Sequence, residues 1–176
     1  ETVTGAYLNR GAEWTLLEQS VRPQGIDHIH LKVKPDGTID DIMVSEVKTG
    51  KSRLGMTKDG KQLLPNWISK RLRDLHGGYK AVSESLKAGK VELRKIPSSP
   101  RKMQILDLPL ARGEKARFWR ENSKSPWKLA ATREQLTQIE KQLNQLSERL
   151  EGTANGKTSY RTRLMRVRPV NGKLLV

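Results

Sequence analysis

Two acidic residues and a lysine, Asp27, Glu46 and Lys48, have the types and spacing that suit phosphodiester hydrolysis. Carboxylates that face each other repel, and a divalent cation between them resolves the conflict because hard oxygen ligands suit Mg²⁺. A lysine beside that cation could orient or help deprotonate an attacking water, while the metal polarises the phosphate and lowers the pKa of the water. The alternative is a plain salt-bridged cluster at the rim of a sheet, because Glu-x-Lys tripeptides often arise by chance.

The segments that carry these residues have the pattern of a β-hairpin. Residues 26–34 alternate in a strand-like way, Pro35-Asp36-Gly37 marks a tight turn, and residues 38–48 read as a second strand. We take Asp36 and Gly37 as the two loop residues, which pairs Pro35 with Thr38.

This register places the three residues on one face. Asp27 then lies opposite Glu46, opposite residues of an antiparallel pair project from the same side, and Lys48 joins them through the strand period of two. One bulge would break the register. His28 and His30 fall on the other face, where we expect an ordinary surface or packing role rather than metal binding. The apolar residues on the face of Asp27 are Ile29, Leu31, Ile42 and Val44.

The first 75 or so residues resemble a known family. Gly25-Ile26-Asp27, a spacer and Ser45-Glu46-Val47-Lys48 resemble the core of the PD-(D/E)XK, or restriction-endonuclease-like, nucleases. The run from Glu46 to Gly55, followed by Thr57-Lys58-Asp59-Gly60-Lys61-Gln62, Trp67-Ile68 and Arg71-Leu72, is similar to nuclease modules at the C-termini of bacterial polymorphic toxins. Those toxins include contact-dependent inhibition, Rhs and type VI secretion effectors. Ile26 stands where the family name has proline.

The resemblance implies roles for particular residues. Asp27 and Glu46 would bind the metal, Mg²⁺ or another divalent cation such as Mn²⁺ or Zn²⁺, and Lys48 would be the catalytic lysine. The family often adds a glutamate from the first helix, for which Glu1 fits best and Glu13 and Glu18 are rivals. Gln62 matches a glutamine that follows the Glu-x-Lys strand in similar toxins and would touch phosphate or water.

The remaining segments indicate a mixed α/β fold. We expect a restriction-endonuclease-like core, with a central mixed sheet flanked by helices, over residues 1–96, and an extension with a long helix and a basic hairpin over residues 97–176. The sequence predicts helices at 1–12, 64–75, 79–86 and 129–150, short strands at 14–18, 91–96 and 103–110, and a hairpin at 160–176. Leu136, Ile139, Leu143, Leu146 and Leu150 form a narrow seam that suits packing within the chain more than dimerisation.

The charge points to a polyanionic partner. The chain has 176 residues with 34 Lys+Arg against 19 Asp+Glu, a formal net charge of +15. Nucleic acid is the first candidate because neutralised phosphates release counterions, and an anionic membrane surface or an acidic protein is the alternative. With no cysteine, neither a disulfide nor a thiolate metal site can form. No apolar run is long enough to span a membrane, and we expect the chain to be part of a longer protein.

Three groups of basic residues are candidates for contact with a nucleic-acid backbone, which positions a protein without specifying sequence. The loop after the catalytic strand supplies the first group, the helix after Pro65 the second and the basic C-terminal strand the third. In order, they are Lys51, Arg53, Lys58 and Lys61; Arg71 with Lys70 and Arg73; and Arg161 and Arg163 with Arg166 and Arg168.

Taken together, these patterns predict a metal-dependent DNA endonuclease with low sequence specificity, the toxin domain of an interbacterial competition effector. It would be delivered from the producing bacterium, act in the target-cell cytoplasm, and require an immunity protein, expected to be acidic, in the producer. The alternatives are a non-catalytic basic nucleic-acid-binding module, an RNase on the same scaffold, and a housekeeping repair or recombination nuclease.

Overall fold

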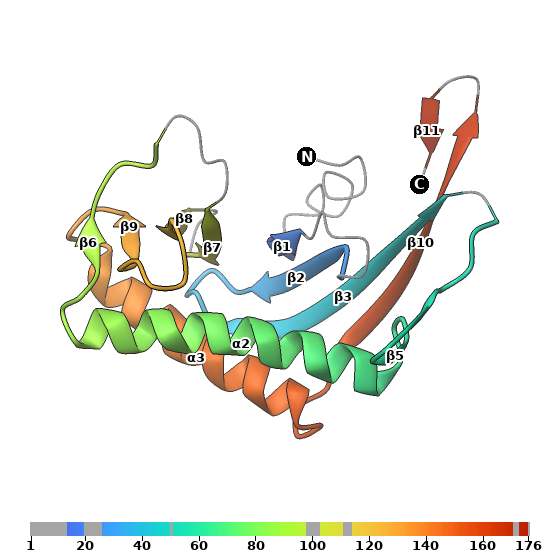
Figure 1. Ribbon diagram of the computed structural model, residues 1–176, viewed down its shortest axis with the longest axis horizontal. Coiled ribbons are helices and arrows are strands. Elements are labelled where there is room, and N and C mark those ends of the chain that lie inside the picture. Colours follow the sequence, from blue (N-terminus) through green and yellow to red (C-terminus); the bar gives the residue numbers. More distant parts are fainter. Residues whose placement is uncertain are drawn as a thin grey trace.

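The computed structural model describes residues 14–19, 26–49, 51–97, 103–110, 114–170 and 173–175. The helix expected over residues 1–12, and with it Glu1, lies outside the described residues, as does Glu13. Within the described part the chain is a mixed α/β fold, as predicted (Figure 1).

A five-stranded mixed sheet carries the predicted hairpin. Its strands are β1 (Trp14–Gln19), β2 (His28–Val33), β3 (Ile39–Thr49), β10 (Arg161–Val170) and β11 (Lys173–Leu175), in the order β1-β2-β3-β10-β11. Neighbouring strands are antiparallel except β10, which runs parallel to β3. The C-terminal hairpin is therefore present, and its first strand lies inside the central sheet, although we expected residues 97–176 to be an extension packed on the core.

The β2–β3 turn differs from the prediction, but the register beyond it does not. The loop has three residues, because the N–H of Lys34 donates to the carbonyl of Thr38 at 2.9 Å and Gly37 has a φ of 84°. The pairing of Pro35 with Thr38 was therefore wrong. A bulge at Asp40 cancels the offset, since Val33 pairs with Ile39 but Lys32 pairs with Asp41.

From that bulge to His28 opposite Ser45, the pairing follows the predicted register. The one-residue error at the turn therefore does not reach the residues near Asp27 and Glu46. A hydrogen bond from the helix over residues 136–154 also fixes the turn, because the buried Gln142 side chain donates from Nε2 to the carbonyl of Gly37.

Two long helices cover one face of this sheet (Figure 1). The helix α2 (Pro65–Lys87) is continuous, whereas we predicted two helices separated near Gly77-Gly78. The helix α3 (Leu136–Ala154) begins later than the predicted start at residue 129. Its leucine seam is buried in the same core cluster as Trp67, Ile68 and Leu72 of α2, except that Leu136 is half-buried at the edge of the cluster. The expectation that the seam packs within the chain is confirmed.

A second sheet lies over the C-terminal half of α2 (Figure 1). It has the order β6-β9-β8-β7, from β6 (Glu92–Leu93), β9 (Lys128–Ala130), β8 (Lys115–Arg120) and β7 (Gln104–Pro109). Of the predicted strands, 103–110 is largely confirmed and 91–96 is reduced to two residues, whereas β8 lies in a segment for which no element was predicted. The hydroxyl of Tyr79 donates to the carbonyl of Asp107 at 2.6 Å and joins α2 to this sheet.

A small hairpin, β4 (Met56–Thr57) and β5 (Gly60–Lys61), lies between β3 and α2 in a segment expected to be a loop. The described residues contain no helix that is both long and apolar enough to cross a lipid bilayer.

Candidate active site

The hairpin brings Glu46 and Lys48 to the end of β3, next to Asp27. Glu46 is buried, with 1% of its surface exposed, and its Oε1 lies 2.7 Å from Nζ of Lys48. Asp27 immediately precedes β2, and its Oδ2 accepts a hydrogen bond of 2.6 Å from the backbone N–H of Val47. The carboxylate of Asp27 is therefore held against the strand segment between Glu46 and Lys48.

Gln62 completes this cluster from outside the sheet. Its Nε2 donates to Oε1 of Glu46, and its Oε1 accepts from the N–H of Gly55 at 2.7 Å. The backbone N–H of Gln62 also donates to the carbonyl of Gly55 at 3.0 Å. Both ends of the side-chain amide are thus bonded, and the amide orientation is fixed. The structure brings together four of the five residues predicted to be catalytic.

The environment of Glu46 opposes its ionisation. Burial raises its pKa most strongly, the hydrogen bond from Lys48 lowers it, and the charge of Asp27 raises it. The charge of Lys48 and the backbone N–H of Asp27 lower it by less, and the net shift is upward. Its second oxygen, Oε2, is buried without a hydrogen-bond partner among the described residues. A buried anionic oxygen in that state is costly unless a cation or a donor meets it.

These features test whether a divalent cation fits. The hard carboxylate oxygens of Asp27 and the unpartnered Oε2 of Glu46 are suitable ligands for Mg²⁺. A third side-chain ligand is not found nearby, because no group of three or more His, Asp or Glu side chains converges within the described ranges. Glu18 lies in β1 opposite Ile29, two residue pairs away from the level of Asp27. The residues present therefore fit a cation held by two carboxylates.

A salt-bridged aspartate anchors the β4–β5 hairpin to α2. Asp59 lies 2.6 Å from Nζ of Lys70 and 3.2 Å from Nη2 of Arg71, and these partners lower its pKa. The guanidinium of Arg71 also lies 5.5 Å from the ring centre of Trp67. Arg71, predicted to contact DNA, is thus already engaged within the protein. Sequence reasoning missed this role of Asp59, which only the fold reveals.

The other basic residues predicted to contact DNA differ in their exposure and in their partners. Lys51, Arg53, Lys58 and Lys61 are all exposed in the segment that links β3 to α2. Arg161 is paired with Asp41 at 2.5 Å, and Arg163 lies level with Ser45.

The strand β10 adds one arginine to the face of the candidate site. Arg166 lies level with Lys48, and side chains at the same level of neighbouring strands project from the same face. Its Nη1 donates to the carbonyl of Ser52 at 2.9 Å. The sequence showed four arginines in this strand but could not say which one would neighbour Lys48, because that depends on the pairing of β10 with β3.

The two histidines of β2 are packed on the opposite face. His28 and His30 are 2% and 0% exposed, with ring centroids 5.8 Å apart. Burial, with a smaller contribution from His28, lowers the pKa of His30 to about 4. Of the two predicted roles for these residues, surface or packing, the structure supports packing.

Comparisons with family models, with curated proteins and with solved structures returned no match for this chain.

Proposed function

We propose that the chain is a divalent-metal-dependent phosphodiester hydrolase that cuts DNA. The observation that carries the proposal is the buried Glu46 carboxylate, which has one oxygen held by Lys48 and Gln62 and the other without a described partner beside Asp27. A purely structural ion pair would gain nothing from leaving one buried oxygen unpaired, whereas a ligand position requires it.

Each residue has a distinct part in this proposal. Asp27 and Glu46 would hold the cation, which when bound polarises the scissile phosphate and lowers the pKa of water. Lys48 lowers the pKa of Glu46 against the effect of burial, and its ammonium lies where it can orient an attacking water and offset charge on the phosphate. Gln62 fixes the rotamer of Glu46.

The substrate and the biological setting rest on charge and on the resemblance. A formal net charge of +15 and the four exposed cations between β3 and α2 favour a polyanion. By resemblance to toxin modules, the domain would be delivered from a producing bacterium, act on DNA in the target-cell cytoplasm, and be blocked in the producer by an acidic immunity protein.

One observation favours a second candidate function, a non-catalytic nucleic-acid-binding module. Oε1 of Glu46 already receives two donors, as expected of a carboxylate with a structural role. This candidate predicts salt-sensitive DNA binding without metal-dependent cutting.

The test is cleavage of plasmid DNA with Mg²⁺, Mn²⁺ or Zn²⁺, and with EDTA, by the wild-type chain and by Asp27→Asn, Glu46→Gln and Lys48→Met. We expect cleavage only with a divalent ion and a loss of about 10²–10⁴-fold in Lys48→Met. The exposed Glu148→Gln is the matched control and should retain full activity.

Circular dichroism establishes that each variant is folded. Undiminished cutting by both Asp27→Asn and Glu46→Gln would overturn the assignment of the site. Cutting of tRNA or rRNA with DNA left intact would replace the DNase with an RNase on the same residues. Salt-sensitive binding with no cutting of any substrate would establish the binding module.

A further inference from the structure

A second basic site lies at the other end of α2, away from Glu46. It is a pocket of about 370 Å³ between the last turns of α2 and the loop that joins β8 to β9. None of the described residues that line it is acidic. Its polar lining consists of Ser85, Lys90, Arg120, Ser123, Lys124 and Ser125.

The guanidinium of Arg120 is fixed in advance at this pocket. Its Nε donates to Oε1 of Gln104 at 2.8 Å, and its Nη1 donates to the carbonyl of Ser123 at 3.1 Å. The group also lies 4.3 Å from the ring centre of Trp127, which is buried beneath it. A planar guanidinium that is already oriented loses little freedom when it binds an anion such as phosphate.

The loop beside Arg120 is equally well defined. Oδ1 of Asn122 accepts from the backbone N–H groups of Lys124 and Ser125, at 2.9 and 3.0 Å. The acid in this loop, Glu121, is engaged with Lys128 at 2.7 Å. The cations Lys90 and Lys124 are exposed at the rim of the pocket. The pocket therefore has a positively charged lining that is open to solvent, as a binding site for an anion requires.

We propose that this pocket binds a backbone phosphate of double-stranded DNA, at a distance from the hydrolytic site. The assignment rests on the DNA-binding half of the proposed function. Because Lys90 and Lys124 lie on the open rim, the pocket can bind a phosphate on the surface of a duplex, and the DNA strand does not need to enter the pocket.

The length of α2 sets the spacing between the two sites. Gln62 precedes the first turn of this 23-residue helix, and Lys90 follows its last turn. At 1.5 Å per residue the helix spans about 35 Å, which matches one turn of B-DNA, about 34–36 Å.

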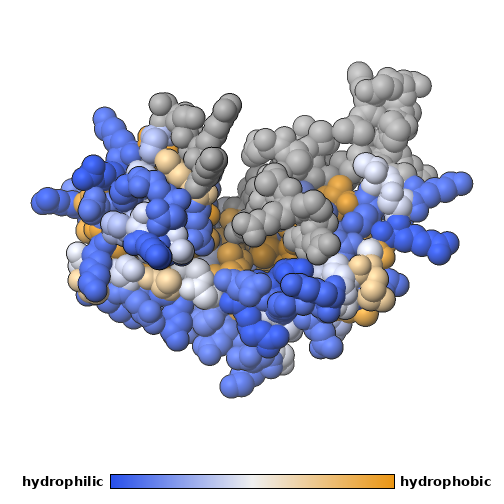
Figure 2. All heavy atoms as spheres, viewed as in Figure 1, coloured by the Kyte–Doolittle hydropathy of each residue, from blue (hydrophilic) through white to orange (hydrophobic). Residues whose placement is uncertain are grey.

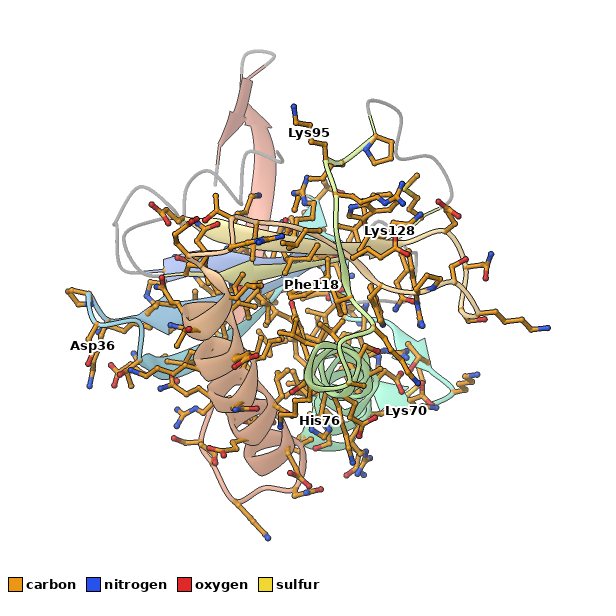
Figure 3. All side chains as sticks on the ribbon, turned by 90° about the vertical axis from the view of Figure 1, so that its left-hand side faces the viewer. Asp36, Lys70, His76, Lys95, Phe118 and Lys128 are labelled. Carbon is orange, nitrogen blue, oxygen red and sulfur yellow. The ribbon has the colours of Figure 1, made fainter. Side chains whose placement is uncertain are left out.

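The two sites also share a side of the molecule. Figure 3, which views α2 along its axis, shows the β4–β5 hairpin and the loop before β9 on the same side of the helix. Hydrophilic residues cover α2 on the face that Figure 2 shows. A duplex laid along the helix could therefore contact both ends at once.

The test compares two doubly charge-reversed variants in binding to fluorescent duplexes in EDTA, so that no cutting occurs. Lys90→Glu with Lys124→Glu alters the pocket. Lys141→Glu with Lys157→Glu is the control, because it makes the same change in net charge at exposed positions outside the pocket.

For a duplex of about 24 base pairs, we expect the pocket variant to bind about tenfold more weakly and to lower the salt slope by about two, one for each lysine that is replaced. For a duplex of about 8 base pairs, roughly 27 Å long at 3.4 Å per pair, the same variant should lose less than about twofold, because this duplex cannot span both sites.

An equal loss in the control variant, or an equal loss with the short duplex, would overturn the assignment. Saturation of the wild-type pocket by inorganic phosphate below about 1 mM, read from tryptophan fluorescence, together with no dependence on duplex length, would make it a small-anion site instead. A chain that cuts no DNA but shows the length-dependent loss would refute the hydrolase and leave this pocket assignment standing.

Discussion

The side-chain amide of Gln62 donates a hydrogen bond to Oε1 of Glu46, a residue 16 positions earlier in the chain. This bond ties the end of β3 to the segment that leads into α2. The same amide accepts the N–H of Gly55, so the β4–β5 hairpin and the candidate site share one buried side chain. A substitution at Gln62 therefore acts on the site without removing any of its charges.

We expect Gln62→Met to lower stability and activity together. The apolar side chain has a similar length but removes a buried bond to a charged acceptor, which costs about 1.5–3 kcal/mol. Loss of a residue that orients a metal ligand lowers metal affinity or activity about 10–100-fold. Urea unfolding and metal titrations of DNA cleavage measure the two effects. Unchanged cleavage in a destabilised variant would leave Gln62 with a structural role alone.

The buried His30 makes stability depend on pH. Its folded-state pKa of about 4 lies below the ordinary value of 6.5, so the unfolded chain binds the proton more tightly. The stability that neutral His30 contributes is therefore complete above about pH 6.5 and is lost as the pH falls towards 4, by an amount on the order of 3 kcal/mol.

The variant His30→Leu should flatten this pH dependence. Neither ring nitrogen of His30 has a hydrogen-bond partner among the described residues, so an apolar replacement leaves no donor or acceptor behind. Chemical denaturation of both proteins from pH 7 to pH 4 gives the difference between their free energies of unfolding at each pH. The contribution of the carboxylates that both proteins share cancels in this difference. Parallel stability curves would show that His30 does not titrate in this range.

Much of the candidate site could be predicted because it depends on local pattern. Asp27, Glu46 and Lys48 come together through strand alternation and one turn, both of which are visible in the sequence. The turn prediction was wrong by one residue, and the site kept its geometry because the bulge at Asp40 compensates. Neither the three-residue loop nor this bulge has a signal strong enough to be recognised from the sequence alone.

The features that could not be predicted depend on contacts between distant segments. The neighbour of Lys48 in the sheet is Arg166, and this pairing is fixed only when β10 takes its place beside β3. In the same way, α2 continues through Gly77-Gly78, where glycine normally weakens a helix. Packing against β7 favours a glycine at the second of these positions, because Leu106 approaches the position that a Cβ on Gly78 would occupy to 3.3 Å.

The two glycines should therefore respond oppositely to the same substitution. Gly77→Ala would meet nothing within 4 Å, so the higher helix propensity of alanine should raise the free energy of unfolding by about 0.5–1 kcal/mol. Gly78→Ala would press on the Leu106 side chain and should lose this gain or reverse it. Thermal unfolding of the two variants side by side is the measurement. A gain at both positions would mean that β7 yields at Leu106 without cost.

Divalent ions should stabilise the folded chain through Asp27 and Glu46. An ion that binds only the folded state adds about 2.7 kcal/mol at a concentration of 100 Kd. For a chain of this size that corresponds to a rise in Tm of roughly 5–11 °C. The rise should vanish in Asp27→Asn and in Glu46→Gln, because each variant removes one of the two carboxylates that would hold the ion. The rise should persist in Glu148→Gln, because the carboxylate of Glu148 is exposed on α3.

Differential scanning fluorimetry with Mg²⁺ or Mn²⁺ against EDTA measures this shift in Tm without any substrate. An equal rise in all four proteins would place the ion elsewhere, whereas no rise in the wild-type chain would mean that the described carboxylates do not bind it on their own.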